Sequence, residues 1–83
     1  MQKLTKDYMI EQMLIKYSYT VAEYDSFYNR YRKLKVESIR AIYDLMKLEK
    51  IQNRYELENR LSMKMVYEKR RLHANHKESS KWI

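Results

Sequence analysis

Most of the architecture follows from residues 20–51, which read TVAEYDSFYNRYRKLKVESIRAIYDLMKLEKI. Apolar or small side chains recur along this segment every four and three residues, the spacing that places them on one face of an α-helix. The members of this line are Phe27, Tyr31, Leu34, Ser38, Ala41, Leu45 and Leu48. The next apolar residues, Ile51 and Leu57, fall off the line. The pattern therefore predicts one long helix over 21–51.

Side chains that can cap a helix stand at three places in this chain of 83 residues. Thr5 precedes an amphipathic segment, and Thr20 forms the capping-box pattern with Glu23. Asn53 offers a similar pattern with Glu56, and it can also take the left-handed conformation that ends a preceding helix. The predicted helices span 6–17, 21–51 and 54–74, which gives a single helical domain over 1–74 and a basic, frayed tail over 75–83.

The composition favours an all-α fold. Leucine, methionine, lysine, arginine and glutamate dominate, and the β-branched residues never form an alternating run. The chain has no glycine and no proline, so tight hairpin turns lack their usual residues. We therefore expect an all-α, three-helix domain with one long central helix.

The apolar surface of these predicted helices exceeds what so short a chain can bury by itself. The segment over 6–17 carries two apolar rows, and the segment over 21–51 is apolar over much more than the roughly 100° stripe that one neighbour covers. We expect a homodimer that shares its core, although a surface reserved for a foreign protein fits the same pattern. The residues expected at this dimer or partner interface are Tyr8, Ile10, Leu14, Tyr17, Tyr24, Tyr28, Ile39, Ile42 and Met46.

Positive charge is concentrated in two segments of a chain whose formal net charge is +7. Residues 30–35 contain four cations and no acid, and residues 64–83 contain six cations and two acids. Such patches bind phosphate backbones through counterion release, and a tyrosine among the cations suits contact with a sugar or base. The residues expected to bind nucleic acid are Arg60, Lys64, Tyr67, Arg70, Arg71, Arg30, Arg32, Lys33 and Lys35.

A helix-turn-helix motif can be drawn over 54–74, with its turn at 61–63. Two acids fit this motif badly. Glu58 stands where a small residue lets the two helices approach, and Glu68 stands where an apolar residue faces the core. The sequence therefore favours a plain basic helix on a helical bundle.

The composition argues against most catalytic chemistry. Without cysteine there are no thiol nucleophiles or thiolate metal sites, and without glycine no loop cradles a nucleotide. His73 and His76 are three residues apart, but a third metal ligand is not evident. No apolar run approaches the about 20 residues of a membrane span, and the N-terminus lacks the apolar segment of a signal peptide. We expect a cytoplasmic protein that is not an enzyme, uses no cofactor or metal and does not bind membranes.

Two functions fit these observations. The first is a small basic regulator of transcription that binds double-stranded DNA, mainly its phosphates, through the C-terminal helix. The alternative is a phage- or plasmid-type inhibitor or adaptor that binds a host protein through its Tyr/Met-rich helical surface. In that case the basic patches face an acidic protein partner. Both hypotheses remain open at the level of the sequence.

Overall fold

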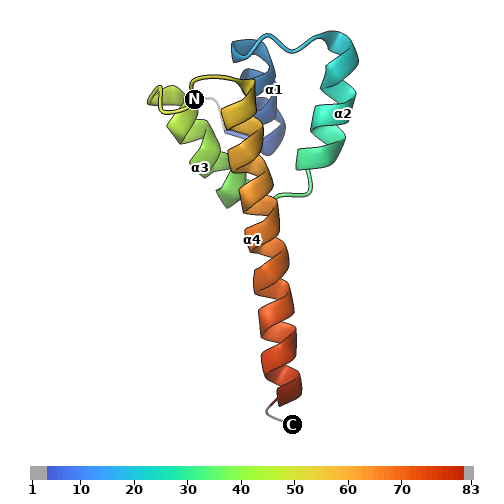
Figure 1. Cartoon of the computed structure of the whole chain (residues 1–83). Coiled ribbons are helices and arrows are strands. Elements are labelled where there is room, and N and C mark those ends of the chain that lie inside the picture. Colours follow the sequence, from blue (N-terminus) through green and yellow to red (C-terminus); the bar gives the residue numbers. More distant parts are fainter. Residues whose placement is uncertain (1–3, 82–83) are drawn as a thin grey trace.

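A computed structural model describes the backbone of residues 4–81 and the side chains of residues 4–70. This part of the chain is all-helical, as the composition predicts. The helices are α1 (Lys6–Lys16), α2 (Val21–Tyr31), α3 (Val36–Lys47) and α4 (Arg54–Lys81). The first three helices and the start of α4 form a head, and the rest of α4 projects from it (Figure 1).

The prediction of one long helix over 21–51 is wrong, because the chain breaks it into α2 and α3 at residues 32–35. An unbroken helix could turn only one stripe of its wide apolar sector toward a neighbour. After the break, α2 buries Phe27 and Tyr31, α3 buries its own stripe, and Leu34 between them is 1% exposed. In the described part of the chain, four helices thus replace the expected three-helix domain with a long central helix.

The helix N-termini are capped as the sequence predicts. The Oγ1 atom of Thr5 accepts a hydrogen bond from a first-turn amide of α1 at 3.1 Å. Thr20 and Glu23 form the complete capping box, in which the Thr20 amide donates to Glu23 Oε1 at 2.8 Å. The Oδ1 atom of Asn53 accepts from the Glu56 amide at 2.9 Å. These side chains fix where α1, α2 and α4 begin.

Helices α1 and α3 end in the same way although the chain has no glycine. Ser18 (φ 57°) and Glu49 (φ 60°) adopt the left-handed conformation just after each helix. The amides of the residues that follow them bond back to the carbonyls of Leu14 and Leu45 at 3.0 and 2.9 Å, which is the Schellman geometry. The left-handed role predicted for Asn53 is therefore wrong, because Glu49 has already ended α3.

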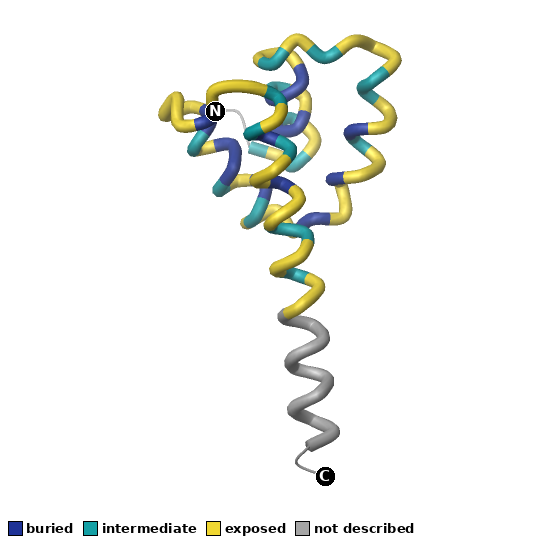
Figure 2. Tube along the Cα trace, viewed as in Figure 1, coloured by how far each residue is buried: buried dark blue, intermediate teal, exposed yellow. Residues whose placement is uncertain are grey.

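The head buries one apolar core to which all four helices contribute. Figure 2 shows the buried residues gathered there, while α4 becomes more exposed as it leaves the head. The four-helix arrangement covers most of the apolar rows on which the expected homodimer rests, but Ile15 of α1 and Leu48 after α3 remain 63% and 67% exposed. The homodimer therefore stays a prediction. The core residues are Met9, Ile10, Met13, Leu14, Phe27, Tyr31, Leu34, Ile39, Ile42, Tyr43, Met46, Ile51, Leu57 and Leu61.

Helix α4 is uninterrupted over its 28 residues. Because the chain stays helical through 61–63, the helix-turn-helix motif drawn there is excluded. The helix also continues past residue 74, the end predicted for it. The predicted domain boundary at 74 and the frayed tail stay predictions, since the side chains after residue 70 lie outside the described part. None of the helices described here combines the length and apolar character needed to cross a bilayer.

Candidate polyanion-binding surface

Residues 32–35 form a short loop that a lysine from another helix holds in place. Lys6 of α1 donates from Nζ to the carbonyl of Arg32 at 2.6 Å and to the carbonyl of Leu34 at 2.9 Å. The ammonium group thereby satisfies the carbonyl of the C-cap residue of α2 and a second carbonyl in the loop. The ammonium group also lies at the negative end of the α2 dipole, where a cation is stabilising.

Glu68 of α4 fixes the other side of the loop by binding the start of α3. One carboxylate oxygen, Oε2, accepts from the amide of Lys35 at 3.1 Å and from the hydroxyl of Ser38 at 2.5 Å. The N-cap residue of α3 is Lys35, which provides no side-chain cap, and Glu68 accepts from the amide of this residue although the two are 33 residues apart in sequence. The contact seats the loop against α4. The two basic segments that the sequence singles out therefore meet in one region.

Five of the predicted nucleic-acid-binding cations lie on the loop or on α4 without a described acid as partner. Lys33 and Lys35 are exposed on the loop, Arg60 and Arg70 are exposed on α4, and Lys64 is half-buried. No carboxylate among residues 4–70 lies within 4.0 Å of their charged nitrogens. Their positive charge is therefore available to a ligand.

The aromatic member of the predicted site is also accessible. Tyr67 is 61% exposed and follows Arg60 and Lys64 on one face of α4 at spacings of four and three residues. Its phenol can reach a phosphate and its ring can lie against a sugar or base. Arg71, which continues the row, lies outside the described side chains.

Arg30 and Arg32 are less available than predicted. The Arg30 guanidinium lies 3.7 Å from a carboxylate oxygen of Glu58 and 5.9 Å from the centre of the Tyr31 ring. The Arg32 guanidinium lies 6.0 Å from the centre of the Tyr28 ring. Arg30 is thus partly neutralised on the α2 flank of α4, and Arg32 retains its charge over an aromatic face.

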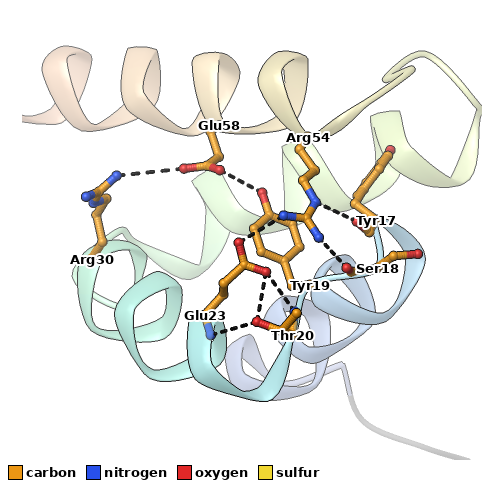
Figure 3. Close-up of polar contacts among 8 residues, drawn as sticks. All are labelled: Tyr17, Ser18, Tyr19, Thr20, Glu23, Arg30, Arg54 and Glu58. Atoms are coloured by element: carbon orange, nitrogen blue, oxygen red, sulfur yellow. Dashed lines mark hydrogen bonds and ion pairs between the residues drawn. The ribbon is translucent and has the colours of Figure 1, made fainter.

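Glu58 anchors α4 to α2 (Figure 3). Its carboxylate accepts hydrogen bonds from the hydroxyls of Tyr19, at 2.8 Å, and Tyr31, at 3.3 Å, in addition to the Arg30 ion pair. Burial, followed by the hydrogen bond to Glu58, raises the pKa of Tyr19 above its ordinary value. Both acids that fitted the helix-turn-helix motif badly, Glu58 and Glu68, therefore hold α4 against the other helices.

Arg54 joins the first turn of α4 to the turn between α1 and α2, a role that the sequence analysis missed (Figure 3). Its guanidinium donates to the carbonyls of Tyr17, at 2.9 Å, and Ser18, and to Glu23 Oε2 at 2.9 Å. It also lies 4.2 Å from the centre of the Tyr19 ring. The available signal was its position directly after a helix cap. Because these bonds use all three guanidinium nitrogens, we assign Arg54 to the fold and not to ligand binding.

The pKa of Glu23 is held below its ordinary value by the same network. The largest cause is the hydrogen bond from the Thr20 amide, followed by the bond from the Thr20 hydroxyl, with a smaller contribution from Arg54. All three interactions favour the ionised carboxylate.

The residues expected at a dimer or partner interface lie mostly inside the chain. Four tyrosines of the set, Tyr8, Tyr17, Tyr24 and Tyr28, pack half-buried against the core. This surface is therefore largely used by the fold itself. The remaining five residues are at most 4% exposed, namely Ile10, Leu14, Ile39, Ile42 and Met46.

An apolar groove between α3 and α4 is the feature that the sequence analysis missed most completely. It encloses about 520 Å³. Ala41, the smallest hydrophobic side chain in the line of residues along α3, leaves part of this space. Its small size was the available signal. The groove is lined by Ala41, Ile42 and Leu45 of α3 and by Arg60, Met63, Lys64 and Tyr67 of α4.

Within the side chains that the structure describes, no group of three or more histidines and acids is placed to hold a metal ion. His73 and His76 lie outside that set. No family model matches the chain, and neither a curated protein nor a solved structure is significantly similar to it. The charge and shape of the molecule itself are thus the basis for a function.

Proposed function

We propose that the protein binds nucleic acid, in particular double-stranded DNA, through phosphate contacts from α4 and the 32–35 loop. The observation that best supports this is the contact of Glu68 with the start of α3. It places Lys33 and Lys35 beside the cationic part of α4, although the two segments are far apart in sequence. Grouped cations that no described acid neutralises repel one another, and a polyphosphate relieves this repulsion.

The shape of the molecule supports the same function. Helix α4 projects from the head (Figure 1), and its 28 residues span about 42 Å. A single α-helix fits the major groove of B-DNA, which is about 12 Å wide. With α4 in the groove, Arg60, Lys64 and Arg70 would contact phosphates. Any sequence preference would come from an arginine or from Tyr67 reaching a base edge.

Such a protein would act as a regulator of transcription in the cytoplasm. A protein that binds DNA without catalysing a reaction acts by occupying a site on the DNA. A homodimer would double the number of phosphate contacts and would favour a two-fold symmetric site. Since most of the apolar core is buried within one chain, the dimer is a separate proposal, which sedimentation equilibrium at micromolar concentration tests directly.

The test of DNA binding is the salt dependence of affinity for a fluorescent duplex, measured by anisotropy. Each lost phosphate contact should lower the slope of log affinity against log salt by about 0.9. The double variant Lys33→Ala/Lys35→Ala should therefore bind all duplexes more weakly and with a lower slope. The matched control is Lys47→Ala/Lys50→Ala, which removes the same charge at the opposite end of α3 and should change the slope less.

The variant Arg70→Ala/Arg71→Ala tests the contribution of α4 in the same assay. We expect weaker binding to every sequence and a lower slope. Absence of duplex binding at low salt, or an affinity that does not change with salt, would contradict the proposal. Either result would favour the alternative, a phage- or plasmid-type inhibitor or adaptor that binds a host protein. That alternative needs a surface other than the largely buried Tyr/Met set, and the α3–α4 groove is an exposed apolar surface.

A further inference from the structure

We propose that the groove between α3 and α4 binds an acidic amphipathic helix of a partner protein. The floor of the groove is apolar. Ala41, Ile42 and Leu45 form one wall, and Met63 and Tyr67 form the other. Met63 and Tyr67 are 63% and 61% exposed, so a partner can contact both.

The dimensions of the groove match two turns of a helix. On the α4 side, the residues that line the groove run from Arg60 through Lys64 to Tyr67, at intervals of four and three residues. This wall is about 10 Å long, because a helix rises about 1.5 Å per residue. A partner helix that lies along it can insert side chains from positions i, i+4 and i+7, the pattern of helix-in-groove recognition.

The charges around the groove select an acidic partner. Arg60 and Lys64 belong to its lining, and no acid among residues 4–70 lies within ion-pair distance of either. On α3, Arg40 and Asp44 neutralise each other at 3.3 Å. Glu37 lies one turn before Ala41, outside the residues that line the groove. Carboxylates beside the apolar anchors of a partner helix would therefore meet two unneutralised cations.

The same observations disfavour two other occupants. A second copy of this chain would bring a net charge of +7 toward a groove that already holds two cations. A nucleobase would bury its hydrogen-bonding edges against aliphatic side chains, among which only the Tyr67 hydroxyl and the two cations could pair with them. A helix satisfies its own backbone groups and presents only side chains, so it can fill an apolar groove without this cost.

The binding of a partner helix would interfere with the proposed binding of DNA. Arg60, Lys64 and Tyr67 belong both to the groove and to the row proposed to contact phosphates. An acidic helix in the groove would neutralise part of that row, so the two ligands should compete. The helix proposal itself does not depend on DNA binding, because its test needs no nucleic acid.

The test uses the full chain and three synthetic fluorescent peptides, with binding measured by anisotropy. The first is an amphipathic helix with leucines at i, i+4 and i+7 and glutamates beside them. The second has the same composition in scrambled order, and the third has lysines in place of the glutamates. We expect the first peptide to bind at least about tenfold more tightly than the other two.

Charge-exchange variants then locate the site. Arg60→Glu/Lys64→Glu should weaken binding of the acidic peptide at least about tenfold and strengthen binding of the lysine peptide. The control Lys50→Glu/Lys69→Glu makes the same change in net charge at exposed residues that do not line the groove. It should leave the preference for the acidic peptide unchanged. An equal loss in both variants would mean that only net charge matters, and would overturn the proposal.

Steric variants test the apolar wall. Ala41→Trp fills the groove and should abolish peptide binding while circular dichroism and the melting temperature show a folded protein. Should Ala41→Trp fail to fold, Tyr67→Ala removes an exposed wall residue and should weaken binding at least about tenfold. Unchanged peptide binding in a folded variant would refute the proposal. A second result would also refute it: the parent protein binds no peptide, and Ala41→Trp loses self-association or oligonucleotide binding. Either loss would assign the groove to a different occupant.

Discussion

Replacement of Glu68 by alanine tests the contact that brings the two basic segments together. The change removes the carboxylate that accepts hydrogen bonds from the Lys35 amide and the Ser38 hydroxyl. It leaves the Lys35 amide at the start of α3 without its acceptor and the loop without this contact to α4. Because α4 and α3 are joined at this point by a polar contact, we expect a loss of stability without a large change in the core.

The expected magnitude follows from the three interactions that Glu68 makes. Loss of the hydrogen bond from the Lys35 amide costs about 1 kcal/mol. Loss of a carboxylate near the positive end of a helix dipole adds about 0.5 kcal/mol at a half-buried site. The hydroxyl of Ser38 loses a bond to a charged acceptor, but solvent can replace part of it. Together we expect the free energy of unfolding to fall by about 2 kcal/mol, and by about half of that in Glu68→Gln, which keeps an acceptor.

Chemical denaturation monitored by circular dichroism measures this loss. The control is Asp25→Ala, which removes an exposed acid from α2 and should change the free energy of unfolding by less than about 0.5 kcal/mol. In a double-mutant cycle with Ser38→Ala, the coupling to Glu68→Ala should be about 1 kcal/mol. A loss in Glu68→Ala no larger than in the Asp25 control, or a coupling near zero, would refute the role assigned to Glu68 at the start of α3.

Three further changes test the head. Ser18→Gly should raise the free energy of unfolding by about 1 kcal/mol, because glycine adopts the left-handed conformation without strain; an unchanged denaturation midpoint would argue against strain there. Glu23 has a lowered pKa, so its stabilisation is complete above its ordinary value of 4.5 and disappears as the pH falls through the folded pKa. The stability difference between the parent and Glu23→Gln should shrink over that acid range, and a constant difference would contradict the network. Tyr19 has a raised pKa, so stability should fall as the pH rises past the ordinary value of 10.0, and less steeply in Tyr19→Phe.

The local signals in the sequence predicted the starts of the helices well. Thr5, Thr20 and Asn53 act as caps because a cap needs only a few consecutive residues, all of which the sequence shows. The break at 32–35 could not be predicted in this way. The periodic line continues through it, and the contacts that stabilise the loop come from Lys6 and Glu68, both distant in sequence.

The sequence predicted which segments of the candidate site are basic, but it did not predict which of their cations are exposed and unpaired. Local counts of charge identified the loop and α4 as basic, but only the fold shows that Arg30 lies against Glu58 while Lys33 and Lys35 are exposed. The apolar residues expected at an interface differ for a related reason, because most of them lie in or against the core of the chain. Periodicity says which side chains share a face of a helix, but the number of helices decides which of those faces are covered. With one long helix over 21–51, the chain has too few helices to cover every apolar face. The division of this segment into α2 and α3 adds one more helix that can cover them.

The positive character of the surface depends on where the fold directs its acids. In an isolated helix, Glu68 would lie one turn from Lys64 and could pair with it. In the folded chain the carboxylate is turned to the amide of Lys35, and no ion pair with Lys64 forms within 4.0 Å. Glu58 is likewise engaged by two tyrosine hydroxyls. Folding thus directs acids of α4 toward the other helices and leaves its cations on the surface, so the exposed side of this helix is more positive than its composition indicates.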